Sequence, residues 1–423
     1  MKAVRFIEEG RPPEILDVPK PAPGPGEILV KIAGAGVCHS DLHVLDHGIG
    51  IPGPFTLGHE NAGWVAALGQ GVTGWKEGEP VAVYGPWGCG LCHQCQTSAE
   101  NYCERHASIP SYGGGLGSDG GMAEYMIVPS PRLLVPLGKL NPAMAAPLSD
   151  AALTPYHAIK AALPLLTPDA TVVVLGIGGL GHIAVQILKA LTSARLIACD
   201  IDEAKLAHAR QLGVERTINT QDGALAAEEI ADLVGERGVT VALDFVGAQP
   251  TIDLCSRIVG RASRISVVGL AGGTLHYSPN MPPFGCEVSI PYWGSRTELI
   301  EVIALAESGH IRAAVETFPL ENAVDVYQRL REGRTVVEDR VHDQRAGELG
   351  MAAHHQVAAL DLANVDQGRQ FAANGRADTL EPAAILLLPR QLIVVVGNVL
   401  GTQRKQCQQV QYPPAEPASP GLL

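Results

Sequence analysis

Four cysteines stand close together in the chain, in the pattern Cys89-x2-Cys92-x2-Cys95-x7-Cys103. Zinc binds such thiolates tetrahedrally, and a site closed by four of them leaves no position for a substrate. The pattern therefore predicts a structural zinc ion that holds the polar segment 86–105 together. An iron–sulfur cluster is the competing cofactor, although nothing nearby indicates electron transfer. Four unligated thiols are a third explanation.

Another set of metal-binding side chains is scattered along the chain: Cys38, the neighbours His59 and Glu60, and Asp150. A catalytic zinc ion takes about three protein ligands and keeps a fourth position for water or substrate. Each residue also has an ordinary explanation, because a single cysteine or histidine often only packs in a core. The spacing alone leaves a catalytic metal site and plain packing both open.

A glycine motif lies between a buried strand, 171–175, and an amphipathic helical segment that follows it: Gly176, Gly178, Gly179 and Gly181, with Leu180 among them. The first glycine allows a tight turn, the second lets the backbone approach a pyrophosphate, and Gly181 permits close helix packing. The N–H groups that begin the helix would face the phosphates. The pattern alone is weak evidence, but here the strand and the helix that it requires flank it.

Asp200 ends the next strand, 196–199, and follows Gly181 by 19 residues. About 20 residues are expected before the acid that binds the adenosine ribose. A carboxylate there accepts from the ribose hydroxyls and repels a 2′-phosphate, so we predict NAD rather than NADP. A solvated acid at the strand end is the alternative. Lys205 is assigned to the same ribose, with an ordinary solvated helix lysine as the other explanation.

The elements that must position these groups change in type near residue 150. The first 150 residues are rich in glycine and proline, with short β-type runs at 27–33 and 64–67, which predicts a loop-rich antiparallel β domain. From residue 171 strands alternate with helices, which predicts right-handed crossovers and a doubly wound parallel sheet of Rossmann type. The further strands are expected at 239–246 and 265–269, and the further helices at 203–212, 251–259, 298–308 and 324–330.

The composition excludes several classes of protein. A formal charge of −13 disfavours nucleic acid or anionic lipid as the main partner. The first ten residues carry no apolar signal run, and the longest apolar stretch, 383–400, is broken by Pro389, Arg390 and Gln391, whereas a membrane span needs about 20 apolar residues. We expect a cytoplasmic protein. The isolated cysteines are expected to be buried apolar filler: Cys199, Cys255, Cys286 and Cys407.

Further motifs carry a family resemblance: Gly34-Ala-Gly-Val-Cys38-His39-Ser40-Asp41, Gly58-His59-Glu60, Pro147-Leu-Ser-Asp150, Thr154-Pro-Tyr-His157 and Pro291-Tyr-Trp-Gly294. Over residues 1–337 the sequence resembles the zinc-containing medium-chain dehydrogenase/reductases, and within them bacterial secondary-alcohol dehydrogenases. The resemblance implies a GroES-like catalytic domain at 1–150 with its structural zinc lobe at 86–105, a NAD-binding Rossmann domain at 151–292, and a return to the catalytic domain at 293–340. It also implies two zinc ions per subunit, a homodimer or homotetramer, and hydride transfer between NAD and a small primary or secondary alcohol.

Position by position, the resemblance implies that Cys38, His59 and Asp150 hold the catalytic zinc. Glu60 matches an acid that can approach the metal during ligand exchange, and Asp41 would orient His59. Many relatives have cysteine in place of Asp150, but an oxygen ligand also suits zinc.

The same matching assigns a proton relay and several cofactor contacts. Ser40 matches a hydroxyl that accepts the alcohol proton, and His43 matches the end of the relay, with a merely structural histidine as the alternative. His39 matches a position that meets the cofactor pyrophosphate. Further cofactor contacts are expected from Val246, Gly269 and Arg334.

Three aromatic residues are expected to line the substrate pocket: Phe55, Tyr292 and Trp293. Bulky side chains there would favour small alcohols or ketones. The alternative is that all three are core or interface residues.

The C-terminal part departs from the family. Relatives usually close the catalytic domain with a Gly-Arg-x-Val-Val strand after a short spacer, but here Gly333 runs straight into Arg334-Thr-Val-Val337. Residues 341–423 have no family counterpart and are expected to form a poorly ordered or aberrant tail rather than an added functional module.

Two alternative functions remain beside that of an active alcohol dehydrogenase. One is a related zinc dehydrogenase acting on polyols, amino alcohols or aldehyde adducts. The other is a folded but inactive NAD-binding protein, impaired by its altered C-terminus. A zinc-free quinone reductase fits poorly, because such relatives lack the four-cysteine lobe and the pairing of Cys38 with His59.

Overall fold

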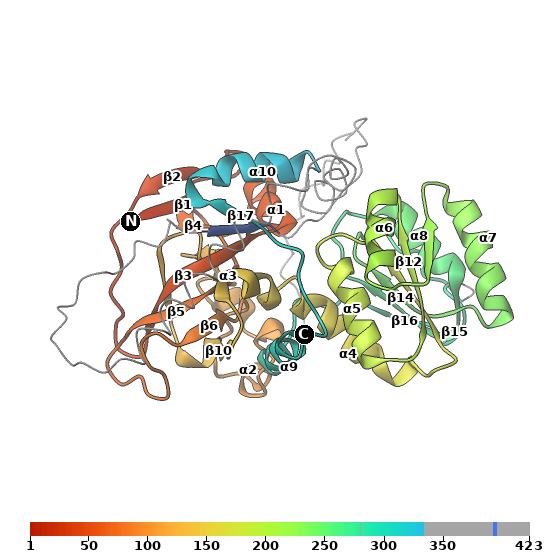
Figure 1. Cartoon of the computed structure of the whole chain (residues 1–423), viewed down its shortest axis with the longest axis horizontal. Helices are drawn as coiled ribbons and strands as arrows, with labels where there is room; N and C mark the ends of the chain where they lie inside the picture. Colours follow the sequence, from red (N-terminus) through yellow and green to blue (C-terminus); the bar gives the residue numbers. More distant parts are fainter. Residues whose placement is uncertain (280, 334–391, 396–423) are drawn as a thin grey trace, which may run out of the picture.

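The computed structural model of the chain describes residues 1–279, 281–333 and 392–395 (Figure 1). These residues form two halves, one built mainly on antiparallel strands and the other on an open parallel sheet. Within them, no helix has the length and apolar character needed to cross a membrane. Of the predicted tail, 341–423, only residues 392–395 lie among the described residues, and Cys407 lies outside them.

The first half contains two sheets. The smaller has the order β2-β1-β4 and consists of β1 (Lys2–Phe6), β2 (Glu14–Asp17) and β4 (Phe55–Thr56). The larger has the order β10-β6-β5-β3-β18-β17, with β9 paired to β3 beside this path. Its strands are β3 (Ile28–Val37), β5 (Glu60–Leu68), β6 (Pro80–Val83), β9 (Tyr125–Val128), β10 (Leu134–Pro136), β17 (Glu316–Pro319) and β18 (Leu392–Val395).

The pairing of β3 with β5 brings distant residues together. The two strands are antiparallel, and Gly36 near the end of β3 lies opposite Glu60 at the start of β5. Cys38, directly after β3, and His59, directly before β5, therefore emerge side by side. Cys38 then caps helix α1 (His39–His47), accepting from the Ser40 peptide N–H through its sulfur.

The second half is a six-stranded parallel sheet of order β13-β12-β11-β14-β15-β16. Its strands are β11 (Thr171–Leu175), β12 (Arg195–Asp200), β13 (Arg216–Asn219), β14 (Val239–Asp244), β15 (Val259–Val267) and β16 (Glu287–Ser289). Its helices are α5 (Gly181–Leu191), α6 (Glu203–Gln211), α7 (Gly223–Val234) and α8 (Gln249–Ile258). The strand order reverses between β11 and β14, which is where doubly wound sheets bind ligands.

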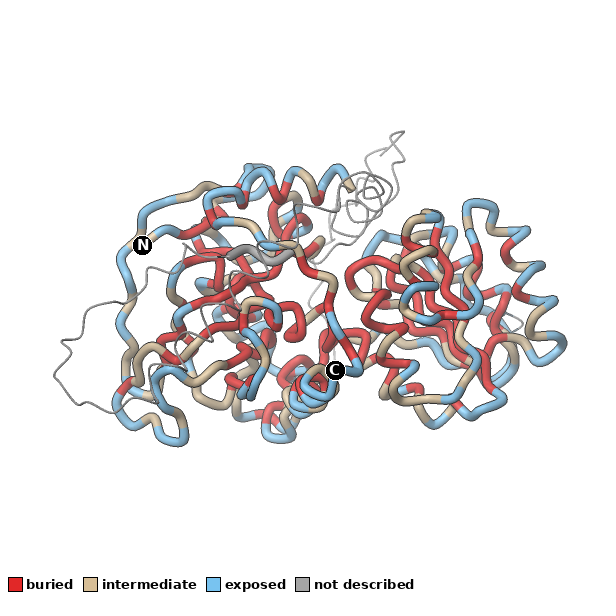
Figure 2. Tube along the Cα trace, in the orientation of Figure 1, coloured by how far each residue is buried: buried red, intermediate tan, exposed pale blue. Residues whose placement is uncertain are grey.

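Both faces of this sheet are covered. Alternate residues of β11 pack into different cores: Val172 and Val174 lie with α5, whereas Val173 and Leu175 lie with α7 and α8. Figure 2 shows the strands of this half as a continuous buried layer between helices with exposed outer faces. The predicted Rossmann sheet with a β-rich partner domain is therefore confirmed.

The remaining helices join the halves and support the cleft between them. Helix α4 (Leu153–Ala162) packs against both α5 and α9 (Arg296–Glu307). Helix α10 (Ala323–Arg331) contacts α1, where Arg331 donates two hydrogen bonds of 2.7 Å to Asp46. The short elements are α2 (His93–Gln96), α3 (Pro142–Ala145), β7 (Gly113–Gly114) and β8 (Gly117–Ser118).

Candidate active site

A cleft of about 790 Å³ lies between the two halves and is lined by residues of both. The first half contributes the start of α1 and the residues around His59 and Asp150. The second half contributes the loop after β11 and the loops that follow β14 and β15. Cys38 and His59, which lie more than 100 residues before the glycine motif, and Asp150, which lies 26 residues before Gly176, therefore face the same hollow as the motif.

The scattered ligand set is assembled at the floor of this cleft. One ligand atom each of Cys38, His59, Glu60 and Asp150 lies within 4.8 Å of all the others. The His59 Nε2 atom is 3.3 Å from Asp150 Oδ2, and Thr154 donates a 2.6 Å hydrogen bond to the other oxygen of Asp150. Plain packing would not bring a thiol, an imidazole and two carboxyl groups to one point, so this arrangement favours a metal site.

Asp41 contacts both His59 and Cys38. Its Oδ1 atom is 2.9 Å from His59 Nδ1, and its Oδ2 atom accepts from the Cys38 peptide N–H at 3.0 Å. With the Nδ1 proton directed to Asp41, the Nε2 lone pair faces the other ligands. Burial lowers the pKa of His59, but the carboxylates of Asp41 and Asp150 outweigh it and hold the pKa well above its usual range. A cation at Nε2 would compete with this proton.

Two buried atoms without a hydrogen bond support a cation at this site. Among the described residues, His59 Nε2 and Glu60 Oε2 are buried and make no hydrogen bond, and His59 Nε2 has only the 3.3 Å contact with Asp150, itself a candidate ligand. Burial and the Asp150 carboxylate raise the pKa of Glu60 well above its usual range. Gly36 makes room for this acid, since a Cβ atom there would lie 1.7 Å from Glu60 Oε2. Zinc suits a donor set of one sulfur, one nitrogen and carboxylate oxygen.

The four-cysteine lobe forms a second ligand cluster, on α2 and the neighbouring turns. Cys89 Sγ lies 3.9 Å from Cys95 Sγ, and Cys92 Sγ lies 4.0 Å from Cys103 Sγ. Four sulfurs at about 2.3 Å from a tetrahedral zinc ion would be about 3.8 Å apart. The peptide N–H groups of Leu91 and Cys92 lower the pKa of Cys89 to about 6, which favours the thiolate. The geometry fits a closed structural zinc site.

The glycine motif adopts the turn that its sequence predicts. Gly176 has a φ of +87°, and a Cβ atom on Gly181 would lie 1.8 Å from the Gly176 carbonyl oxygen. Helix α5 therefore starts directly against the end of β11. Gly176, Gly178 and Leu180 line the cleft, whereas Gly179 and Gly181 complete the turn behind them.

Asp200 and Lys205 are both buried beside this loop. Asp200 Oδ2 accepts from the Ile177 peptide N–H at 2.7 Å, and its Oδ1 accepts from Asp202 at 3.0 Å. The Lys205 ammonium lies 3.5 Å from Asp200 Oδ1 with only 1% of the side chain exposed. The alternative explanations of a solvated acid and a solvated lysine are therefore wrong. The carboxylate is held next to the glycine loop, where a ribose would lie.

The other cofactor positions are placed as follows. Val246, Gly269 and His39 line the cleft. Gly269 packs so closely on Val246 that a Cβ atom would lie 2.1 Å from its carbonyl carbon. Burial, followed by the charge of His43, lowers the pKa of His39 to about 4, so His39 is neutral at physiological pH. Arg334 lies outside the described residues.

The predicted relay residues also line the cleft. The Ser40 hydroxyl is 3.6 Å from Cys38 Sγ, and His43 follows one helical turn later on α1. His43 is exposed to solvent, and partial desolvation of its ring is the main cause that lowers its pKa. A neutral imidazole at this position can accept a proton.

Two of the three predicted pocket aromatics are in place and one is not. Tyr292 and Trp293 line the cleft. Phe55 is only 3% exposed and packs on Phe6, with ring centroids 4.8 Å apart, in the core of the first half. The prediction that Phe55 lines the pocket is therefore wrong, because β4 pairs with β1 and directs this side chain inward.

The sequence motifs did not predict several residues that line the cleft: Ile49, Asn101, Tyr102, His106, Tyr112 and Leu116. Most belong to the four-cysteine lobe and the loop after it. Only the position of Asn101 and Tyr102 directly before Cys103 could have pointed to them, and the pattern does not show that this lobe reaches the cleft.

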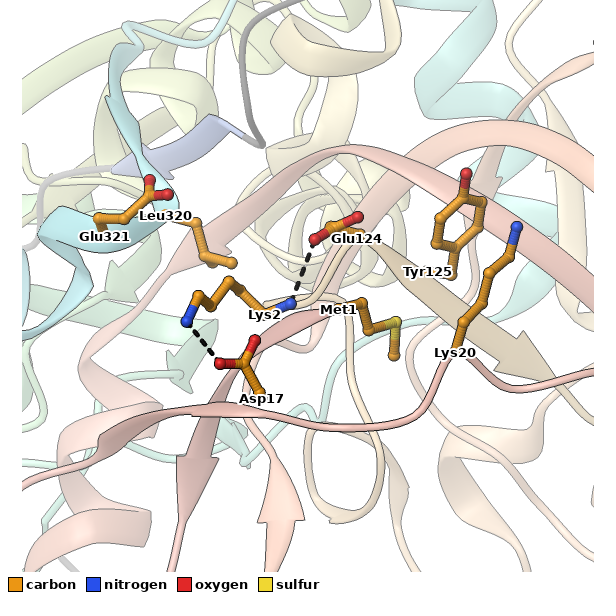
Figure 3. A pocket seen from close by; sticks show the side chains of 8 residues that line it. All are labelled: Met1, Lys2, Asp17, Lys20, Glu124, Tyr125, Leu320 and Glu321. Atoms are coloured by element: carbon orange, nitrogen blue, oxygen red, sulfur yellow. Dashed lines mark hydrogen bonds and ion pairs between the residues drawn. The ribbon is translucent and has the colours of Figure 1, made fainter.

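A second hollow, of about 470 Å³, lies on the surface near the N-terminus (Figure 3). The two lysines that line it already interact with protein groups. Lys2 forms an ion pair with Asp17 at 2.7 Å, and the Lys20 ammonium lies 3.7 Å from the centre of the Tyr125 ring. It has no ligand cluster, so the chemistry belongs to the cleft.

Family models match the two halves of the chain separately. Residues 24–139 match the alcohol dehydrogenase GroES-like domain, and residues 179–308 match the zinc-binding dehydrogenase domain. An NAD-dependent alcohol dehydrogenase of Sulfurisphaera tokodaii is 32% identical over 79% of this chain and 98% of its own length. The chain belongs to the zinc-containing alcohol dehydrogenase family.

Other members of this family are similar in sequence and structure. The crystal structure of the alcohol dehydrogenase of Aeropyrum pernix superposes with a TM-score of 0.73 at 36% identity, covering 79% of this chain and 98% of that one. An acetophenone reductase of Geotrichum candidum in complex with NAD has a TM-score of 0.68 at 31% identity, with 79% and 95% covered. A D-arabinose 1-dehydrogenase (NADP(+)) of Saccharolobus solfataricus is 33% identical over 79% of this chain and 95% of that protein.

Proposed function

We propose that the chain catalyses reversible hydride transfer between NAD and a small primary or secondary alcohol, giving an aldehyde or ketone. The observation that carries the proposal is the single cleft that brings the Cys38, His59 and Asp150 set to the same hollow as the glycine loop. A nicotinamide held by this loop can reach a substrate held by the ligand set. Holding the two reactants together removes much of the entropic barrier to transfer.

Cys38, His59 and Asp150 would hold the catalytic zinc, which when bound acts as a Lewis acid towards the substrate oxygen. Asp41 keeps the His59 ring in the ligating orientation through its 2.9 Å contact with Nδ1. Glu60, which is buried with its carboxylate within 4.8 Å of the other ligand atoms, would approach the ion when a ligand exchanges.

Ser40 and His43 would move the proton. The Ser40 hydroxyl lies next to Cys38 Sγ and faces the cleft, so it can accept the proton of an alcohol. His43, on the same face of α1, can receive that proton and release it to water, because its pKa is lowered and the residue is exposed to solvent.

The second half would bind NAD. Gly176 and Gly178 allow the backbone to approach the pyrophosphate at the N-terminus of α5, and His39 approaches from the first half. The buried carboxylate of Asp200 would accept from the ribose hydroxyls and repel a 2′-phosphate. The same residue argues against the NADP-linked sugar oxidation named for the D-arabinose relative.

Two further proposals concern the state of the protein. A site of four thiolates requires reduced cysteines, which supports a cytoplasmic location. The family resemblance supports a homodimer or homotetramer.

The direct test is NAD-linked oxidation of propan-2-ol by the purified, zinc-loaded chain, followed by NADH absorbance. We expect turnover with small alcohols, acetone reduction in the reverse direction, and a strong preference for NAD over NADP. Faster oxidation of a polyol or an amino alcohol would assign the chain to a different branch of the family. NADH binding without turnover of any alcohol would favour the inactive NAD-binding protein.

A further inference from the structure

Trp293 is held in an unusual backbone conformation at the wall of the cleft. Its φ is +53°, in the left-handed region that bulky residues rarely adopt, and such strain persists only where the surroundings fix the backbone. The indole is 6% exposed and meets the His59 ring edge-on, with centroids 5.6 Å apart. Whatever fixes this residue therefore also fixes the shape of the pocket next to a metal ligand.

Residues of the first half contact the indole of Trp293 and the backbone of the residue that follows it. The indole Nε1 donates to the Ser149 carbonyl at 2.8 Å, and Tyr84 donates through its hydroxyl to the Gly294 carbonyl at 2.6 Å. Gly85 makes room for the ring, since a Cβ atom there would lie 2.0 Å from Trp293 Cζ2. These contacts fix the tryptophan and the residue after it, but not the residue before it.

The peptide groups of Tyr292 are held by the four-cysteine lobe. Asn101 donates through Nδ2 to the Tyr292 carbonyl at 2.8 Å, and the Tyr292 N–H donates to the Tyr102 hydroxyl at 3.4 Å. The lobe thus holds this residue on both its N–H and its C=O side. Asn101 and Tyr102 lie on a short turn that ends at Cys103.

Tyr102 is in turn fixed by a chain of hydrogen bonds. Its hydroxyl lies 2.8 Å from His157 Nε2, and His157 Nδ1 lies 2.8 Å from Glu298 Oε2. The same Glu298 oxygen accepts from the Ser295 N–H and hydroxyl at the start of α9. Hydrogen bonds from α4 and α9 therefore hold the Tyr102 hydroxyl of the lobe in one position.

We propose that Asn101 and Tyr102 form a clamp on Tyr292 and set the size of substrate that the pocket accepts. They are positioning residues: they act through the aromatic wall of Tyr292 and Trp293. The proposal rests on the proposed dehydrogenase function. It gives the four-cysteine lobe a task beyond folding, because the lobe carries the residues that shape the substrate pocket.

The clamp can be tested without turnover, by ¹⁹F NMR of the zinc-loaded full chain labelled with 5-fluorotryptophan. The chain has four tryptophans. We expect Asn101→Leu and Tyr102→Phe each to shift or broaden the Trp293 resonance while those of Trp64 and Trp75 stay in place. A Trp293 resonance unchanged in both variants would overturn the clamp. Tyr277→Phe, at a tyrosine that is 74% exposed, is the matched control.

The effect on substrate size is tested by kinetics of the same variants. The loss of one hydrogen bond predicts that the KM for acetophenone falls about fivefold relative to the KM for acetone. The zinc content and the Kd for NADH should stay within about twofold, and the KM ratio should change more than the kcat for acetone, as expected for residues that position the aromatic wall rather than take part in hydride transfer. An unchanged KM ratio with a displaced Trp293 resonance would overturn the specificity role. A wild-type chain that reduces neither ketone would refute the proposed function itself, and the resonance would still decide whether the clamp exists.

Discussion

Asp200 has two tasks in this structure, since it supports the glycine loop through Ile177 and neutralises the buried Lys205. We expect Asp200→Asn to weaken NAD binding at least about tenfold, because a hydrogen bond to a charged group contributes about 1.5–3 kcal/mol. The discrimination against NADP should shrink as well. Leaving Lys205 buried without its anion should also lower the Tm. Titration of NADH and NADPH fluorescence, with thermal unfolding, measures both effects.

Asp202→Asn is the matched control for this substitution. Asp202 caps α6 by accepting from the Ala204 N–H, and asparagine caps a helix equally well. The control should leave both cofactor affinities and the Tm nearly unchanged. Equal losses in the two variants would mean that charge anywhere near this turn, rather than the ribose-binding position, determines cofactor choice.

The sequence was most informative where chemistry restricts the residue type. Thiolates, histidine and carboxylates at family positions led to the ligands, and the acid after the second strand led to Asp200. Phe55 was misassigned because an aromatic side chain packs equally well in a core or a pocket. Asn101 and Tyr102 were missed because their contacts cross about 190 residues of sequence.

Among the elements, the junction of β11 with α5 depends most on a single residue. A Cβ atom on Gly181 would lie 1.8 Å from the Gly176 carbonyl oxygen. Because this oxygen belongs to the backbone, the clash cannot be relieved by rotating a side chain. We expect Gly181→Ala to destabilise the chain by about 1–3 kcal/mol and to weaken NADH binding at least about tenfold. Gly223→Ala, at the first position of α7 with open space around it, should be neutral or stabilising by up to about 1 kcal/mol. NADH binding as strong in Gly181→Ala as in that control would contradict the geometry.

His182 links α5 to the segment that returns to the first half. Its Nδ1 lies 2.8 Å from the Gly178 carbonyl, and its Nε2 accepts from the Ala314 N–H at 3.0 Å, so the neutral form satisfies both contacts. Burial lowers the pKa of His182 from 6.5 to about 4. Between these values the unfolded chain binds more protons than the folded chain, so stability falls as the pH is lowered. At pH 5 this group alone costs about 2 kcal/mol.

The test compares the Tm at pH 7 and at pH 5 in wild type, His182→Asn and His276→Asn. We expect His182→Asn to have the lower Tm at pH 7 but to lose less on acidification. His276 is an exposed histidine, and its variant should follow the wild type. The same acid-induced loss in all three proteins would show that other groups determine the acid sensitivity.

Periodicity predicted four strands of the parallel sheet (β11, β12, β14 and β15) and three of its helices (α5, α6 and α8), because buried strands and amphipathic helices repeat in a regular pattern. It did not predict the outer strands β13 and β16 or helix α7. The strand predicted at 265–269 is the end of β15, which begins at Val259. Only its first residue, Val259, was assigned to the end of the helix predicted at 251–259, since α8 continues into the strand without a turn, and residues 260–264 were not assigned. The β-rich half was predicted only in outline, because its short strands are defined by pairing across long loops.

On the scale of the whole molecule, the backbone segment β18 closes the larger sheet of the first half. It pairs parallel with β3, with Ile393 opposite Ala35, and antiparallel with β17. A chain ended after residue 340 would lack this strand and leave β3 and β17 unpaired across a gap. We expect this truncation to give an insoluble or strongly destabilised protein, judged by soluble yield and Tm.

A chain ended after residue 400 is the matched control, because it retains β18. It should fold and keep its zinc and NADH binding. If the chain ended after residue 340 proved equally stable, the sheet would have to be closed by another segment, and the family-like run Arg334-Thr-Val-Val337 would be the first to examine. The sequence could not place residues 392–395, because pairing between strands so far apart leaves no local pattern.

We infer that one chain carries two zinc sites of different kinds, one of which belongs to the catalytic cleft. Zinc content per chain, by elemental analysis of the wild type, Cys38→Ala and Cys255→Ala, tests it most directly. We predict about two zinc ions in the wild type and in Cys255→Ala, a buried cysteine outside both clusters, and about one in Cys38→Ala together with loss of alcohol oxidation. One zinc ion or none in the wild type, or two retained in Cys38→Ala, would show that Cys38 does not hold a second, catalytic zinc ion.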